Sequence, residues 1–247
     1  MDQSFTKNQP KWQERQPLPE PDNFPVMSTP TLPPEDSLDD IVAPFSAAAP
    51  KRLGAMCVFC GANAGLDPAF RQAATDLGSA LAAHGATLVT GGGSTGLMGA
   101  VNDGALAGGG KVIGVIPDFL KTKELADLRS TELLVVHDMH TRKRTMFERA
   151  DAFCILPGGV GTLDETFEIV TWRQLHLHNK PIILLNVKDY WTPLLAMFDR
   201  MRDMNFAHHG HEALVTVVHS AAEAILAAER ELAEPKPVVR FPGMKGT

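Results

Sequence analysis

The sequence is poor in the features that mark exported and membrane proteins. Its three cysteines cannot all pair, and Cys57 and Cys60 lie in an apolar run rather than at a helix start, where a redox C-x-x-C would sit. The chain does not begin with a basic segment followed by an apolar one, and no stretch reaches the roughly 18 consecutive apolar residues of a membrane helix. These absences predict a cytoplasmic protein without a membrane partner.

An excess of positive charge is also missing. The chain has 23 lysines and arginines against 29 aspartates and glutamates, which gives a formal net charge of -6 at pH 7. A protein that coats nucleic acid needs a concentrated basic surface to neutralise phosphates. The composition therefore argues against a nucleic-acid partner.

Proline is abundant in one place only. Ten of the 18 prolines fall within the first 50 residues, in a segment with little apolar content and no helical or strand period. Such a segment cannot bury enough apolar surface to order itself. We expect residues 1–50 to be a disordered arm, residues 51–233 to form a single domain and residues 234–247 to be an irregular tail.

Short apolar runs alternate with segments of helical period after residue 51. Strands are expected at residues 53–60, 86–90, 111–116, 132–136, 152–156, 181–186 and 214–218. Helices are expected at residues 67–85, 95–108, 140–150, 162–176, 192–204 and 220–233. Runs that are apolar throughout suit strands covered on both faces, and the alternating order suits a parallel sheet. The sequence predicts an α/β fold, a doubly wound Rossmann-like sheet that binds its ligand at the carboxyl ends of the strands.

A first glycine turn, "GGGSTG" at residues 91–96, follows a predicted strand and precedes a predicted helix. Its Gly91, Gly93 and Gly96 match G-x-G-x-x-G, whose bare backbone amides can approach a phosphate, so Gly93 is a candidate substrate ligand. The spacing also permits a dinucleotide site with Asp118 on the ribose. A third interpretation is structural: the glycines permit a tight turn and close packing of the helix.

A second glycine turn, "PGGVGT" at residues 157–162, has the same position relative to strand and helix. A dinucleotide fold needs only one such turn, so the pair favours phosphate binding. Behind this turn, Thr162 to Glu165 spells T-L-D-E, the sequence of a capping box. Glu165 is therefore either a cap residue or a carboxylate placed to act on the sugar attached to a bound phosphate.

Three cations, Arg142, Lys143 and Arg144, crowd the start of a predicted helix. Cations at that end oppose the helix dipole, so an anionic ligand would explain their presence. A solvated face accounts for Arg144, whereas Arg142 is the candidate ligand, because a planar guanidinium can make two hydrogen bonds to a phosphate or a hydroxyl pair.

No metal is expected, because the histidines lack carboxylate or cysteine partners at matching spacing. The histidines concerned are His137, His140, His208, His209 and His211.

Three stretches, "GGGSTGLMGAVNDGAL", "DMHTRKRTMFERADAF" and "LPGGVGTLDETFEIVTWRQL", resemble the LONELY GUY family of cytokinin-activating phosphoribohydrolases, often mislabelled as lysine decarboxylases. The resemblance implies hydrolysis of the N-glycosidic bond of a nucleoside 5′-monophosphate, with a plain or prenylated adenine base, and no cofactor. It implies that Glu165 and Arg142 form the catalytic pair. The phosphate would be held by Gly158, Gly159, Gly161 and Thr162.

The same resemblance implies further contacts to the nucleotide. Lys143 would line the pocket, Glu132 would face the sugar or base, and Met139 would pack near the base. Many family members have serines where this chain has Ala62 and Asn63, so the Asn63 amide would replace a hydroxyl contact. A homodimer or a higher homo-oligomer is implied as well.

Two other functions remain open on the sequence. A nucleotide-binding or carrier module would use the glycine turns without turnover, and a dinucleotide-dependent oxidoreductase would use the first turn. An amino-acid decarboxylase with pyridoxal phosphate needs a Schiff-base lysine and a partner for the pyridinium nitrogen, and neither turn offers them.

Overall fold

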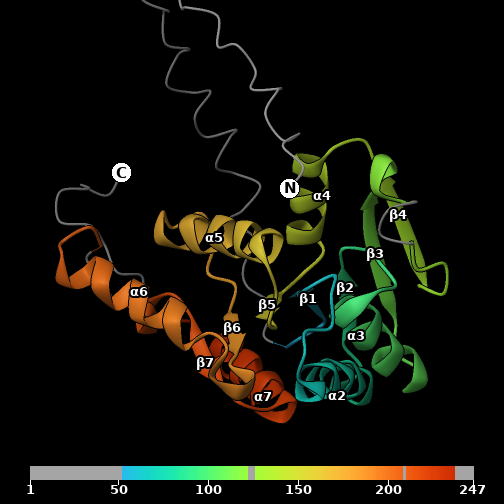
Figure 1. Cartoon of the computed structure of the whole chain (residues 1–247), viewed down its shortest axis with the longest axis horizontal. Helices are drawn as coiled ribbons and strands as arrows, with labels where there is room; N and C mark the ends of the chain where they lie inside the picture. The colour runs from blue at the N-terminus through green and yellow to red at the C-terminus, as the bar shows by residue number, and fades with distance from the viewer. Residues whose placement is uncertain (1–51, 122–125, 208–209, 237–247) are drawn as a thin grey trace, which may run out of the picture. The chain divides into compact units, whose positions relative to one another are not determined.

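A computed structural model describes residues 52–121, 126–207 and 210–236, which fall in one compact unit (Figure 1). Seven strands in these ranges form one parallel sheet in the order β4-β3-β2-β1-β5-β6-β7. Their bounds are β1 (Ala55–Phe59), β2 (Thr87–Thr90), β3 (Val112–Pro117), β4 (Glu132–Val136), β5 (Ala152–Ile155), β6 (Ile182–Leu185) and β7 (Thr216–Val218). The predicted arm, and the tail from residue 237 onward, lie outside the described residues.

Helices alternate with the strands along the chain. Their bounds are α2 (Pro68–His84), α3 (Gly96–Ala107), α4 (Met139–Glu148), α5 (Val160–Gln174), α6 (Thr192–Asp203) and α7 (Ala221–Ala233), with short 3-10 segments η3 (Asp118–Leu120), η4 (Val187–Asp189) and η5 (His211–Ala213). Each predicted strand and helix of the domain is confirmed to within a few residues. None of the helices in the described part of the chain combines the length and apolar character needed to cross a bilayer.

The sheet is covered on both faces. Along β1, Met56 and Val58 pack into one apolar cluster with α2, α3 and α7, whereas Cys57 and Phe59 pack into another with α4, α5 and α6. Successive side chains of a strand point to opposite faces, so a strand covered twice must be apolar throughout. Burying each large apolar side chain contributes about 1.5–3 kcal/mol, which makes the two clusters the main source of stability. The doubly wound fold predicted from the sequence is therefore confirmed.

The strand order reverses at β1. From β1 the chain builds outward through β2, β3 and β4, and then returns to place β5 on the other side of β1. In open parallel sheets such a reversal leaves a crevice beyond the carboxyl ends of the two central strands. The turns that follow β1 and β5 are therefore the first place to look for a ligand site.

A buried histidine follows α5. The Nε2 of His178 lies 2.9 Å from the carbonyl oxygen of Ile169, its Nδ1 accepts from the Lys180 amide at 3.1 Å, and its ring packs edge-on against Phe147. These two contacts suit a neutral imidazole that carries its proton on Nε2 and accepts through Nδ1. A second proton, on Nδ1, would point at the N–H group of Lys180. Burial is the largest cause that lowers the pKa of His178, to about 4.

We predict that this histidine makes stability depend on pH. The folded pKa of about 4 lies below the ordinary 6.5, so the contribution is complete above pH 6.5 and is lost as the pH falls towards 4. Lowering the pH from 7.5 to 4.5 should reduce the unfolding free energy by about 2 kcal/mol through this group. Urea denaturation of His178→Gln should show a shallower pH dependence, whereas the control His140→Gln, at an exposed position, should keep the wild-type slope. Equal slopes for all three proteins would contradict the assignment.

Candidate functional site

A cavity of about 450 Å³ lies where the strand order reverses. Its volume is in the range of small-molecule sites. Most of its lining comes from the turns after β1 and β5, with additional residues from α2, α3, α4, α5 and the segment after β6. The lining residues are Cys60, Gly61, Ala62, Asn63, Ala64, Gly65, Phe70, Leu97, Met98, Arg142, Pro157, Gly158, Gly159, Gly161, Thr162, Glu165 and Tyr190.

Backbone hydrogen bonds hold the walls of this cavity together. The Gly61 amide donates to the Pro157 carbonyl at 3.0 Å, and the Gly61 carbonyl accepts from the Leu97 amide at 3.0 Å. The Thr95 hydroxyl donates to the Ala62 carbonyl at 3.2 Å. The turn after β1 is thus fixed both to the second glycine turn and to the start of α3.

The second glycine turn differs from the sequence-based expectation in one respect. Helix α5 begins at Val160 with Gly159 as its N-cap, a residue without a side chain to make a capping hydrogen bond. Thr162 is therefore already inside the helix, and the predicted capping box from Thr162 to Glu165 is wrong. Glu165 lies in the second helical turn and lines the cavity.

The start of α5 presents bare backbone to the cavity. A side chain at Gly158 would collide with Thr162, whereas Cβ atoms at Gly159 or Gly161 would have no described atom within 4 Å apart from the adjoining backbone. Amides at a helix start have no partner within the helix, and the helix dipole favours a negative charge there. This arrangement suits a phosphate or another anion.

Arg142 reaches the cavity from α4 and is only 4% exposed. Its Nε donates to the Val115 carbonyl at 3.1 Å, its Nη2 donates to the Gly91 carbonyl at 2.9 Å, and its Nη1 lies 3.9 Å from the Met139 sulfur. The guanidinium therefore supports the first glycine turn while it lines the cavity. The role of Arg142 as a ligand stays a prediction, to which the structure adds this supporting role.

The first glycine turn is occupied by contacts within the protein. The Gly93 backbone amide donates to the Met98 sulfur at 3.0 Å, the Gly93 carbonyl accepts from the side-chain Nδ2 of Asn102, and the Gly92 carbonyl accepts from the backbone amide of Asp127. Gly93 is not part of the cavity lining. These contacts favour the structural interpretation, in which the glycines permit a tight turn and close helix packing.

The dinucleotide alternative loses its second element as well. The Asp118 side chain is 75% exposed and pairs with Lys121 at 3.6 Å. It does not line the cavity. We therefore do not carry the oxidoreductase hypothesis further.

Two other predicted residues lie outside the lining and make ion pairs. Lys143 pairs with Asp164 and Glu168 of α5 at 3.2 and 3.3 Å; burial alone would lower its pKa, but these bonds outweigh burial and leave the pKa above its ordinary value. Glu132 lies 3.6 Å from Arg149 and is exposed. Of the residues given weaker roles, Asn63 alone belongs to the lining, and all these roles stay predictions.

The cavity contains a thiol, but not a reactive one. Burial, followed by the Glu165 carboxylate, raises the pKa of Cys60 well above its ordinary value, and Arg142 opposes this in part. The same two groups act on Cys57 in the same directions. Because the thiolate is the nucleophilic form, Cys60 is not suited to covalent catalysis.

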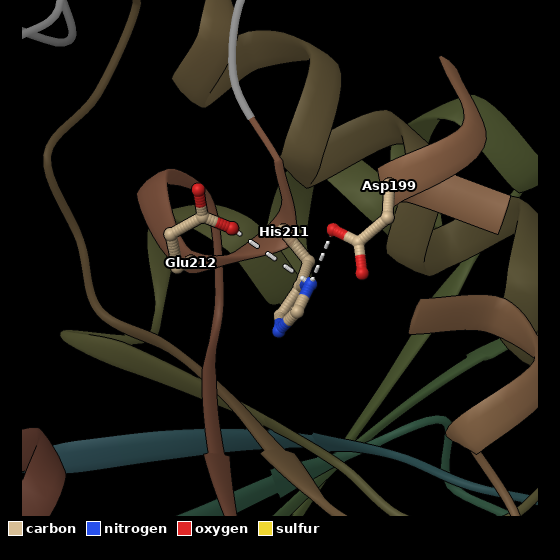
Figure 2. A group of neighbouring side chains, drawn as sticks. All are labelled: Asp199, His211 and Glu212. Carbon is tan, nitrogen blue, oxygen red and sulfur yellow. Dashed lines mark hydrogen bonds and ion pairs between the residues drawn. The ribbon is translucent and has the colours of Figure 1, made fainter. Parts of the chain in front are cut away.

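One group of side chains elsewhere has the composition of a metal site. Figure 2 shows His211 of η5 between Asp199 of α6 and Glu212, with His211 Nδ1 at 3.1 and 3.8 Å from their carboxylates. Arg202 also contacts these two carboxylates, at 3.4 and 3.8 Å. The Arg202 guanidinium thus already balances the negative charge of these two carboxylates, and we assign no metal to this group. His208 and His209 lie outside the described residues.

Sequence comparisons identify related proteins. The family described as "Possible lysine decarboxylase" matches residues 98–228. A "Probable cytokinin riboside 5′-monophosphate phosphoribohydrolase" of Oryza sativa subsp. japonica is 48% identical over 163 residues, 66% of this chain and 73% of the relative. A cytokinin riboside 5′-monophosphate phosphoribohydrolase of Arabidopsis thaliana is 41% identical over 186 residues, 75% of this chain and 84% of the relative.

Structure comparison gives the same fold. The molybdenum cofactor carrier protein of Chlamydomonas reinhardtii superposes with a TM-score of 0.55 at 22% identity, covering 74% of this chain and 100% of the other. At that identity the likeness concerns the fold alone.

We predict that Arg142→Lys destabilises the fold. A lysine cannot reproduce two donors in one plane, so a buried carbonyl of Val115 or Gly91 would lose its partner, at about 1–3 kcal/mol. Urea denaturation of the variant should show this loss in the unfolding free energy. Arg144→Lys, exposed on the same helix, is the control and should stay within about 0.5 kcal/mol of the wild type. If the two variants are equally stable, the supporting role of Arg142 is wrong.

Proposed function

The chain belongs to the LONELY GUY family of phosphoribohydrolases, and from this membership we propose that it cleaves a nucleoside 5′-monophosphate into free base and ribose 5-phosphate. The bond broken is the N-glycosidic bond, and the base is adenine, plain or prenylated. The observation that carries the proposal is a single cavity that combines the bare start of α5 with the side chains of Glu165 and Arg142. An anion site, a carboxylate and a cation within one cavity match a substrate that has a phosphate and a sugar.

The 5′-phosphate is proposed to bind at the start of α5. Gly159 and Gly161 offer amides with open space beside them, and Thr162 lies in the first turn of the helix. The helix dipole adds a favourable interaction with the negative charge. With the phosphate there, the ribose extends towards Glu165, which projects from the next turn of the same helix.

Glu165 is proposed to act on the anomeric carbon. When the bond between C1′ and the base nitrogen breaks, its electron pair leaves with the base, which takes up a proton, and positive charge develops on the ribose. A carboxylate held beside this charge stabilises the oxocarbenium-like transition state, and it can also orient the water whose oxygen adds to C1′. Arg142, fixed in direction by two carbonyls, contributes a cation on the cavity wall.

The base is proposed to occupy the apolar part of the cavity. Phe70, Leu97 and Met98 line this part, and aromatic and thioether groups suit contact with a flat ring. None of the described residues that line the cavity is a lysine. The family description "Possible lysine decarboxylase" therefore has no Schiff-base residue in this cavity to support it.

We extend the proposal to the setting of the enzyme. Three buried free cysteines, Cys57, Cys60 and Cys154, suit the reducing cytoplasm. A homodimer or a higher homo-oligomer is proposed because α6 and the segment after it expose Met197, Met204 and Phe206. Sedimentation at several concentrations would test the assembly.

Replacing Glu165 by glutamine tests the role of the carboxylate. Glutamine keeps the size of the side chain but cannot balance a developing positive charge, so release of free base from AMP should fall by about a hundredfold or more, roughly 2.7 kcal/mol. Glu168→Gln is the matched control, since Glu168 lies on the same helix and pairs with Lys143 rather than lining the cavity. It should keep turnover within about twofold of the wild type, and both variants should keep the wild-type melting temperature.

Two results would change this assignment. Unchanged turnover in Glu165→Gln would require a mechanism based on other groups. A wild-type protein that binds nucleotides tightly and releases base from none of the purine or pyrimidine monophosphates would instead favour the carrier alternative.

A further inference from the structure

Tyr190 lines the cavity and contacts the second glycine turn, and no step of the proposed reaction uses it. The only tyrosine of the chain, it follows η4 after strand β6. Its hydroxyl donates to the Gly158 carbonyl at 2.6 Å. Its ring meets Phe70 edge-on, with ring centres 5.7 Å apart, so both rings form one side of the cavity.

The backbone before Tyr190 adopts a costly conformation. Lys188 and Asp189 have φ angles of 51° and 57°, so two consecutive residues with side chains lie in the left-handed region. Such a conformation persists only where the surrounding structure enforces it. Asn186 supplies part of that enforcement, because its buried side chain accepts from the Trp191 amide at 2.8 Å and donates to the Thr192 hydroxyl at 3.2 Å.

The hydrogen bond to Gly158 controls a peptide group. The Gly158 carbonyl and the Gly159 amide belong to one planar trans peptide, in which the C=O and N–H bonds point in opposite directions. A peptide between two glycines can rotate with little steric resistance, because neither neighbour has a Cβ atom. Holding the carbonyl towards Tyr190 therefore holds the Gly159 amide on the other side, at the N-cap of α5.

We propose that Tyr190 is a positioning residue for phosphate binding. Its hydroxyl locks the Gly158–Gly159 peptide in the orientation that presents the Gly159 amide to the 5′-phosphate. The strained turn at Lys188 and Asp189 brings the hydroxyl to the Gly158 carbonyl. This inference rests on the proposed function in one respect, namely that the phosphate binds at the start of α5.

Tyr190→Phe tests the hydroxyl alone, because phenylalanine keeps the ring against Phe70. The Kd of inorganic phosphate, measured by calorimetry on the full chain, should rise about 3- to 10-fold, the effect of one lost hydrogen bond. The KM for AMP should rise by the same factor with kcat within about twofold, as expected when binding is lost equally in the ground and transition states. The Kd of free adenine is the internal control and should not change.

The outcomes separate this inference from the proposed function. If phosphate binding is weakened in Tyr190→Phe but the wild type releases no base, the inference stands and the hydrolase proposal falls. If the wild type releases base from AMP, and Tyr190→Phe has the same Kd for phosphate and the same KM for AMP as the wild type, the inference is overturned and the proposed function stands. A lower melting temperature with unchanged Kd and KM would give Tyr190 a structural role only, and a wild type that binds no phosphate would also overturn the inference.

Discussion

The hydrogen bond from the Gly61 amide to the Pro157 carbonyl joins the two turns on which the cavity depends. Strands β1 and β5 are neighbours in the sheet, but their chains continue into α2 and α5 on opposite faces. Without a link between them, the turns would separate as the chains diverge. With the link, the start of α5 and the loop after β1 face each other across a fixed gap, and every ligand contact that we propose is made within or beside that gap.

Arg142 connects this gap to the core of the protein. A guanidinium has five donors, and two of them are used for carbonyls of β3 and of the first glycine turn. Its position is therefore set by the sheet rather than by a ligand, so little reorganisation is required when a substrate binds. A fixed charge of this kind is more effective in a transition state than one that must move.

The fold was predictable because strands covered on both faces have to be apolar throughout, and α2 has its cap signals, Asp67 and Gly85, next to its ends. The site was predictable only in part. The spacing of T-L-D-E predicted that the helix begins at Thr162. In the structure α5 begins about one turn earlier, with Gly159 as its N-cap. The Gly93 amide donates to the Met98 sulfur instead of facing the cavity, and the G-x-G-x-x-G spacing does not indicate this contact. Tyr190 joins the site through a contact 32 residues away in sequence, for which the sequence carries no local signal.

The place of the Arg142 guanidinium beside Gly91 has a consequence for how this sequence can diverge. A Cβ atom at position 91 would overlap the guanidinium, so position 91 is not free to vary while Arg142 is held there. A lineage that gained a larger residue at 91 would first need a shorter one at 142. In an alignment, sequences with an arginine at position 142 should therefore keep glycine at position 91. A search for dinucleotide-binding glycines would count this glycine as part of a cofactor motif, although here it makes room for an arginine.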